Sequence, residues 1–144
     1  VNEVISSNIQ MMGLDKYMTL TLFLREGDKF YHAGMHQNLI VFRKESGNID
    51  NIITDGSWLG LHDLMNEFPI QEIEMNKGDI MVLYTDGVTE GKGKDGMLYE
   101  DSGLVEFMRT RGNKSTEELR DDLLEELKNY VNNDDITFMF IKKV

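Results

Sequence analysis

The sequence of 144 residues contains no cysteine, one proline and one tryptophan. Without cysteine it can form neither a disulfide framework nor a thiolate that binds metal or acts as a nucleophile. No apolar run approaches the roughly 20 residues that cross a bilayer, so we expect no membrane contact by this segment. These absences fit a reducing compartment. We therefore expect a cytoplasmic location, although a parent protein could carry a membrane or sensor domain upstream.

Positive charge is also scarce, because 26 acidic residues face 15 lysines and arginines and the formal net charge is −11. Such a balance repels phosphate backbones and anionic lipid head groups, which argues against nucleic acid as a partner. It also provides the carboxylates that a multivalent-cation site requires, although a solvated acidic surface is the commoner cause. The length and the 40% apolar content predict one globular domain over residues 1–144.

Short runs of β-forming residues, separated by turn signals, dominate the first part of the chain. They follow a helix that is already under way at residue 1 and ends near Gly13. Because short loops join these runs, antiparallel pairing is expected. The predicted strands cover residues 17–24, 29–33, 39–42, 49–53, 70–75 and 80–84.

Two helices and one more strand are predicted after a glycine-rich loop at residues 91–96. Asp101 or Ser102 can cap the first, short helix. The capping box Ser115-Thr-Glu-Glu118 begins the second, which has leucines along one face. A final apolar strand covers residues 136–141. This order of elements predicts an α+β fold with a largely antiparallel sheet.

Two acidic turns adjoin two strongly apolar strands. Asp86 and Gly87 follow one strand, and Asp134 and Asp135 precede the other. If these strands are antiparallel neighbours, the carboxylates meet at one edge of the sheet and offer hard oxygen ligands to Mg²⁺ or Mn²⁺. Taken singly, each acid has a simpler explanation. Asp-Gly is a strong turn signal, and an exposed carboxylate there needs no further purpose.

Longer segments around these acids resemble a known family. The string GDIMVLYTDGVTE at residues 78–90 resembles the metal-dependent protein phosphatases (PPM, type 2C), and among them the bacterial SpoIIE-like branch. NDDITF at residues 133–138 resembles the closing motif of that branch. Residues 16–20, 33–37 and 56–60 also resemble family segments, in family order. The resemblance therefore covers nearly the whole chain.

The resemblance implies an antiparallel β-sandwich flanked by helices, with a binuclear Mg²⁺ or Mn²⁺ centre at one end. In such a centre the metals position and acidify a bridging water, which attacks the phosphorus of phosphoserine or phosphothreonine directly. Carried over to this sequence, Asp86 and Asp134 are metal ligands and Asp135 is a neighbouring third. Gly87 would keep the approach to the metals open.

The first two metal-binding motifs of the family, a Gly-Asp-x-Tyr-Asp segment and a Gly-Asp-Val-Ser-Gly-Lys-Gly-like segment, do not occur in this sequence. The chain thus resembles the C-terminal two thirds of the catalytic domain, with an N-terminal truncation. We expect it to be inactive alone. Because the truncation would leave a strand edge unpaired, we also expect self-association as a homodimer.

Relatives in this branch serve partner-switching pathways. The resemblance therefore implies a phosphorylated protein substrate, such as an anti-sigma-factor antagonist. A rival hypothesis is a non-catalytic acidic protein-binding module that keeps the phosphatase fold. The acids at Asp86 and Asp134 favour the enzyme, because a module without metal has little reason to keep both.

Several other residues are predicted to be structural. His36 is interpreted as a loop residue whose ring packs or hydrogen-bonds locally, without a catalytic role. Met81 and Met139 lie within strands and are expected to fill the core. The same expectation of burial applies to Trp58 with Leu59, Leu61 and Leu64.

Overall fold

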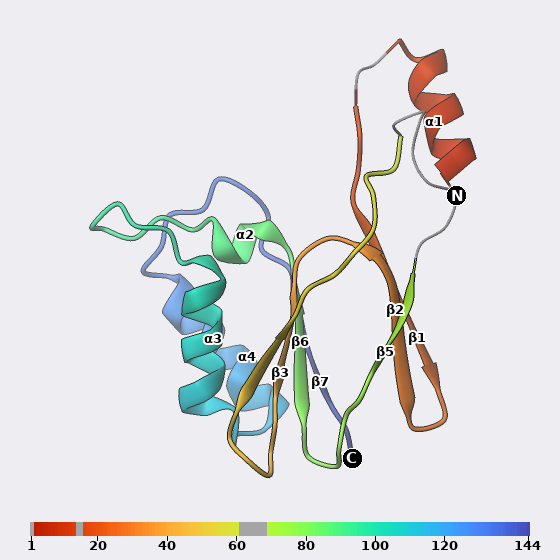
Figure 1. Cartoon of the computed structure of the whole chain (residues 1–144). Helices are drawn as coiled ribbons and strands as arrows, with labels where there is room; N and C mark the ends of the chain where they lie inside the picture. Colours follow the sequence, from red (N-terminus) through yellow and green to blue (C-terminus); the bar gives the residue numbers. More distant parts are fainter. Residues whose placement is uncertain (1, 14–15, 61–68) are drawn as a thin grey trace. The chain divides into compact units, whose positions relative to one another are not determined.

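The computed structural model describes residues 2–13, 16–60 and 69–144. Its elements follow one another in the predicted order, with one short helix added (Figure 1). The chain divides into two compact units, one from residues 1–36 and 54–74 and the other from residues 37–53 and 75–144. Leu61 and Leu64, expected in the core, lie outside the described residues. No helix in the described ranges is long and apolar enough to cross a bilayer.

The first unit contains α1 (Asn2–Met11) and an antiparallel three-stranded sheet. This sheet has the order β1-β2-β5, with β1 (Leu20–Glu26), β2 (Lys29–Met35) and β5 (Ile70–Ile73). The strand expected from residue 17 begins only at Leu20. Met18, just before this strand, pairs with Leu59 instead. The Met18 N–H donates to the Leu59 carbonyl at 2.9 Å, and the Leu59 N–H donates to the Met18 carbonyl at 2.8 Å.

The second unit contains the sheet that positions the candidate site. Its order is β4-β3-β6-β7, and every neighbouring pair is antiparallel. The central strands β3 (Leu39–Phe42) and β6 (Ile80–Tyr84) are almost entirely buried, as their unbroken apolar sequences predict. The outer strands β4 (Ile49–Ile52) and β7 (Phe138–Lys142) are more exposed.

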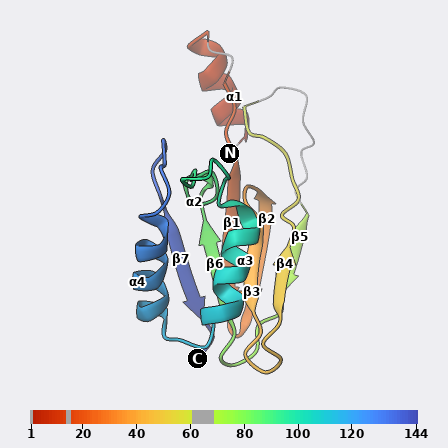
Figure 2. The same cartoon turned by 90° about the vertical axis from the view of Figure 1, so that its left-hand side faces the viewer.

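Helices α3 (Glu100–Arg111) and α4 (Thr116–Leu127) cover one face of this sheet (Figure 2). The leucine face predicted for α4 is confirmed in part, because Leu119, Leu123 and Leu127 are at least 97% buried, whereas Leu124 is 46% exposed. Sheet and helices share one apolar core, and its burial is the main force that holds the unit together. Its members include Ile40, Phe42, Ile80, Val82, Tyr84, Leu104, Phe107, Met108, Leu119, Leu123 and Leu127.

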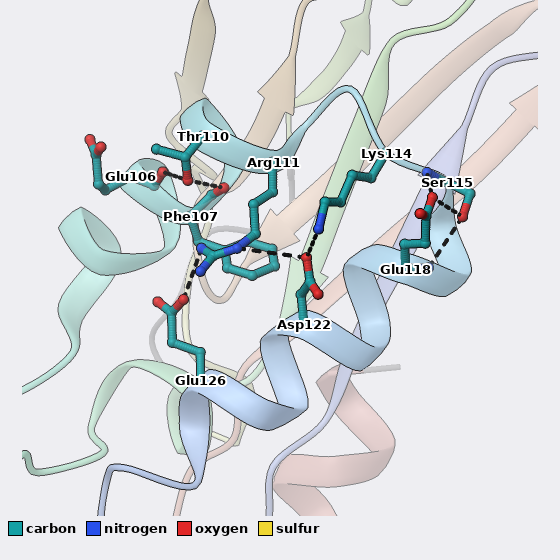
Figure 3. Close-up of polar contacts among 9 residues, drawn as sticks. All are labelled: Glu106, Phe107, Thr110, Arg111, Lys114, Ser115, Glu118, Asp122 and Glu126. Atoms are coloured by element: carbon teal, nitrogen blue, oxygen red, sulfur yellow. Dashed lines mark hydrogen bonds and ion pairs between the residues drawn. The ribbon is translucent and has the colours of Figure 1, made fainter.

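The start of α4 is fixed by the predicted capping box, which is confirmed (Figure 3). The Ser115 hydroxyl accepts from the Glu118 backbone N–H at 3.2 Å, and the Glu118 carboxylate accepts from the Ser115 N–H at 2.9 Å. The end of α3 is tied to the same helix, since Arg111 pairs with Glu126 at 2.9 Å and lies over the Phe107 ring. These contacts hold α3 and α4 together at the surface of the unit.

The predicted cap of α3 is wrong. The helix begins at Glu100, before both Asp101 and Ser102, and no side-chain cap bond is present. The Asp101 carboxylate is engaged elsewhere, because it accepts from the Tyr84 hydroxyl at 2.7 Å and from the Asn38 amide at 3.0 Å. Burial, together with the nearby Asp101, raises the pKa of Tyr84, so its hydroxyl stays protonated and donates. A tertiary contact has replaced the local one.

The prediction for the methionines is half right. Met81 is fully buried, whereas Met139 is 58% exposed. The difference arises because β7 is an edge strand. Its Phe138 and Phe140 pack against the core, and Met139 between them projects to the opposite face. The strand itself begins at Phe138 rather than at residue 136.

The remaining structural predictions fall in the first unit. Leu59 is buried as expected, but Trp58 is 45% exposed, with its ring centroid 5.0 Å from that of Tyr17. The prediction of a core tryptophan is therefore wrong. His36 bonds locally as expected, since its Nδ1 lies 2.9 Å from the Thr19 hydroxyl.

Candidate metal centre

The register of β6 and β7 places the acidic turns at one end of the sheet. The strands are antiparallel, and their last pair at this end is Tyr84 with Phe138. The Thr85 backbone N–H donates to the Thr137 carbonyl at 3.0 Å, which carries the pairing one step beyond the strands. Asp86 follows directly, and Asp134 and Asp135 lie on the facing segment. The structure thus brings together segments nearly fifty residues apart, as the sequence predicts.

Asp86 lies in a short helix, α2 (Asp86–Thr89), where the sequence indicated only a tight turn. The Asp86 carbonyl accepts from the Glu90 N–H at 2.8 Å and from the Thr89 hydroxyl at 3.2 Å. An acidic residue in the first turn is favourable, because backbone N–H groups point out of that end of a helix. The Asp86 side chain uses one of them and accepts from the Gly87 N–H at 3.0 Å.

Gly87 is the point at which α2 touches the loop that leads to β7. A Cβ atom at this position would lie 2.2 Å from the Asp135 carbonyl oxygen and 2.9 Å from its carbon. No side chain fits there without a shift of backbone. Gly87 is therefore required for the close approach of the two acidic segments, which is a stricter role than an open path to the metals.

A cavity of about 290 Å³ lies between these segments. Within the described ranges it is lined by Gly87, Glu90, Asn132, Asn133 and Asp134. Gly87 and Asp134 thus share a cavity, whereas the Asp86 and Asp135 side chains are not among its lining groups. The Asn132 Oδ1 atom is buried and has no hydrogen-bond partner in the described part of the chain.

Sequence reasoning missed Glu90 and the two asparagines as lining residues. The sequence did hold hints that these residues lie near the site. Glu90 is the last residue of the string TDGVTE, and the two asparagines directly precede Asp134. Neither signal is decisive without the structure. Whether a polar loop residue faces a cavity depends on the path of the backbone around it.

The donor set has the chemistry of a divalent-cation site. One oxygen of Asp134 accepts from the Asp135 N–H at 2.8 Å, as one oxygen of Asp86 does from Gly87. These bonds orient the two carboxylates and leave the second oxygen of each without a protein partner among the residues described. Carboxylate oxygens are the ligands that Mg²⁺ and Mn²⁺ prefer.

The number of donors is small. No group of three or more His, Asp or Glu side chains in residues 2–13, 16–60 and 69–144 lies close enough to hold a metal ion. Mg²⁺ favours six oxygen ligands and often keeps several waters. Asp86 and Asp134 therefore fit a metal centre as part of a larger ligand set.

Comparison with known proteins identifies the family. The model of the family described as Stage II sporulation protein E (SpoIIE) matches residues 1–144. No curated protein sequence matches the chain.

Solved structures show the same fold at low sequence identity. The SiaA-PP2C domain of Pseudomonas aeruginosa aligns with a TM-score of 0.80 and 18% identity, over 99% of this chain and 58% of that one. The RsbU and RsbW domains of a Mycobacterium tuberculosis protein align with a TM-score of 0.70 and 21% identity, over 97% of this chain and 40% of that one. A serine/threonine phosphatase of S. agalactiae aligns with a TM-score of 0.71 and 14% identity, over 99% of this chain and 66% of that one.

The chain spans 58% of the length of the first of these structures. These likenesses confirm the α+β, PPM-type fold predicted from the sequence. Because the family model matches from the first residue to the last, the chain belongs to the SpoIIE family of PPM-type phosphatase domains.

Proposed function

We propose that the chain is the C-terminal part of the catalytic domain of a Mg²⁺- or Mn²⁺-dependent protein serine/threonine phosphatase. The observation that carries the proposal is the position of Asp86 and Asp134, at one end of two adjacent strands in a phosphatase-type fold. Both would be metal ligands, and Asp135 would be a third. Further ligands would come from polypeptide outside this sequence.

In such a centre, bound divalent cations lower the pKa of water, so that a hydroxide nucleophile is available at neutral pH. The residues of this chain orient the groups around it. Backbone N–H groups fix the carboxylates of Asp86 and Asp134, and the contact of Gly87 with Asp135 fixes the distance between the two segments.

The substrate class we propose is a protein that carries phosphoserine or phosphothreonine. Within it, a small anti-sigma-factor antagonist in a cytoplasmic partner-switching pathway is the best candidate. Two findings support this choice. The family is that of SpoIIE, and one structurally similar chain joins an RsbU domain to an RsbW domain.

The test uses the complete phosphatase domain of the parent protein, a phosphoserine peptide and Mn²⁺. Asp86→Asn should reduce kcat/KM by about 100-fold or more, since changes beside a metal ligand already cost roughly 10–100-fold. Asp121→Asn removes the same charge from an exposed position on α4 and should leave the rate unchanged.

A fall in rate of similar size in both variants, or in neither, would contradict the assignment of Asp86. A complete domain that binds a phosphoprotein but never hydrolyses it would instead support the non-catalytic binding module.

A further inference from the structure

The loop of residues 91–98, between α2 and α3, begins beside the candidate metal centre. Glu90, just before the loop, lines the cavity there, and so does Asn132, the residue after Val131. The loop pairs with this second segment, because Lys92 and Val131 exchange both backbone hydrogen bonds, at 3.0 and 2.8 Å. From there it extends outward past α2 (Figure 1). The loop is therefore joined to the rim of the cavity by two segments of the chain.

Hydrogen bonds within the loop fix its backbone. The Gly93 N–H donates to the Met97 carbonyl at 2.8 Å, and the Tyr99 N–H donates to the Gly91 carbonyl at 2.9 Å. Tyr99 itself is buried, and its hydroxyl donates to Glu126 of α4 at 2.9 Å. The loop is thus anchored to the core of the second unit and holds its exposed side chains at set positions.

Lys92 lies in the middle of a small ladder, with Leu98 on one side and Val131 on the other. Residues directly opposite each other in antiparallel pairs have their side chains on the same face. Since the N–H and C=O of Lys92 point to Val131, its pair with Leu98 has no mutual hydrogen bonds, and in such pairs the side chains lie closest. Leu98, Val131 and the nearby Met97 are all exposed. This face therefore presents a lysine among apolar side chains.

The loop also carries positive charge in a strongly acidic chain. Lys92 and Lys94 are exposed, and neither side chain forms a hydrogen bond or an ion pair with any residue that the structure describes. Asp95, beside them, is engaged in the turn, where its carboxylate accepts from the Met97 N–H at 3.0 Å. By contrast, Arg111 pairs with an acid of α4. Within this unit, the two ammonium groups of the loop can meet an anion that approaches the cavity.

A phosphorylated protein is an anion for which such cations matter. Its phosphoryl group carries about −1.5 to −2 charges at pH 7. The cavity is lined by the carboxylates of Glu90 and Asp134, which repel acidic side chains beside that group. Lys92 and Lys94 lie two and four residues beyond Glu90, at most roughly 7 and 13 Å along the chain. An extended peptide covers the same distances with two to four of its own residues.

We propose that residues 91–98 and Val131 form a docking surface for an acidic phosphoprotein substrate, in which Lys92 and Lys94 pair with acidic side chains two to four residues from the phosphoserine or phosphothreonine. The exposed apolar side chains around the lysines supply contact area. Lysine is a point charge, so the surface selects negative charge and not one particular acid. The proposal rests on the proposed function, which gives the partner its phosphoryl group, and adds the kind of sequence that surrounds this group.

The test compares two phosphoserine peptides on the full-length parent protein with Mn²⁺. One peptide has acidic residues two to four positions from the phosphoserine, and the other has alanines there. Turnover gives kcat and KM, and the non-hydrolysable phosphonate analogues of both peptides give Kd by fluorescence anisotropy. Lys92→Gln combined with Lys94→Gln should raise KM and Kd of the acidic peptide by about three- to tenfold, because each exposed ion pair is weak. The kcat value and the alanine peptide should be unaffected, and high salt should abolish the preference for the acidic peptide.

Lys77→Gln is the matched control. It removes the same charge from an exposed lysine before β6, at the opposite end of that strand from Asp86, and should change none of the constants. Charge reversal gives the sharpest result. Lys92→Glu combined with Lys94→Glu should bind a peptide with lysines at the flanking positions more tightly than the acidic peptide, the reverse of the unchanged protein. Hydrolysis of p-nitrophenyl phosphate, which has no flanking residues, should be the same in every variant.

Two results would overturn the proposal. The first is a Kd of the acidic analogue that does not change when both lysines become glutamine. The second is an equal loss for both peptides and for p-nitrophenyl phosphate, which would show that the loop shapes the cavity and does not dock a partner. Failure of the proposed function looks different. The acidic analogue would then bind in a manner that depends on Lys92 and Lys94, but no peptide would be hydrolysed, and the docking surface would belong to a binding module.

Discussion

Asp79 is the best-satisfied buried charge of the second unit. Its side chain is 2% exposed and accepts three bonds of 2.9 Å, from the backbone N–H groups of Asn76 and Lys44 and from the Arg43 guanidinium. Burial alone would raise the pKa of Asp79. The hydrogen bonds and the charge of Arg43 outweigh it and hold the pKa below the ordinary 3.8. The ionised form is thus tied to the folded state.

Asp79→Asn should therefore lower the free energy of unfolding at pH 7 by about 1–3 kcal/mol, because the amide cannot accept all three bonds and Arg43 loses its buried carboxylate partner. The pKa of Asp79 is depressed on folding, so its contribution is complete above the unfolded pKa. The contribution is lost as the pH falls through the folded pKa, below about pH 4. Urea titrations from pH 7 to pH 3 measure both effects.

The matched control for Asp79 is Asp50→Asn, since Asp50 pairs with the same Arg43 at 2.6 Å but is 46% exposed. It should cost less than about 1 kcal/mol. Equal losses of unfolding free energy in the two variants would show that burial of the pair does not matter. So would an Asp79→Asn variant whose stability falls between pH 4 and pH 3 as steeply as that of the unchanged chain.

Gly87→Ala should displace the segment of residues 132–136, because the new methyl group would lie 2.2 Å from the Asp135 carbonyl oxygen. We expect a loss of about 1–3 kcal/mol in unfolding free energy and amide shifts in that segment by NMR. Gly93→Ala is the control. There the nearest atom is the end of the Asp95 side chain, which can rotate away. Unshifted amides at residues 132–136 in Gly87→Ala would refute the close approach.

At this scale the sequence predicts the carboxylates well and the cavity poorly. Asp86 and Asp134 could be placed at one sheet end because two apolar strands and their flanking acids are visible in the sequence. Glu90 and Asn132 could not, because their positions depend on α2 and on a backbone contact at Gly87.

Among the elements, α4 offers a direct test of local signals. Ser115→Ala removes the cap of a helix whose leucines form part of the core, and should cost about 1 kcal/mol of unfolding free energy. Ser102→Ala tests the corrected start of α3. Since no side-chain bond caps that helix, this variant should change stability by less than about 0.5 kcal/mol. Thermal or urea unfolding that ranks the two in the opposite order would contradict these cap assignments.

The elements were predictable where composition decides and less so where tertiary pairing does. β3 and β6 have the expected bounds because four or five consecutive apolar residues suit a buried strand. The observed start of β1 is later than the predicted start, because Met18 pairs with Leu59 and not within the strand. The helix α2 escaped prediction because four residues leave no periodic pattern to detect.

For the whole molecule, we expect the 144-residue chain to hydrolyse p-nitrophenyl phosphate at the background rate in the presence of Mn²⁺. Its described residues bring together fewer than three side chains suited to one metal ion, and a hard cation needs about six oxygens. Robust hydrolysis that depends on Mn²⁺ and is lost in Asp86→Asn would contradict this expectation. It would also show that the motifs absent from the sequence are dispensable.

The order of elements, and with it the α+β class, followed from the sequence. The division into two units did not, because each unit is assembled from two separate stretches of chain. Short loops predict that consecutive strands pair with each other. The order of strands within a sheet also depends on burial, which only the folded state defines. β3, for example, pairs with β6 across the whole excursion that forms β5.

The pairing of β6 with β7 has a consequence for the synthesis of the protein. β6 finds one neighbour, β3, already made, but its second neighbour is encoded only after α2, α3 and α4. At about 5–20 residues per second, a ribosome needs roughly 3–10 s to pass from Tyr84 to Phe138. For that interval β6, a strongly apolar strand, has an open edge to which chaperones and neighbouring nascent chains can bind. Asp86 is synthesised in the same interval before Asp134, so the candidate centre cannot form until both segments have been made.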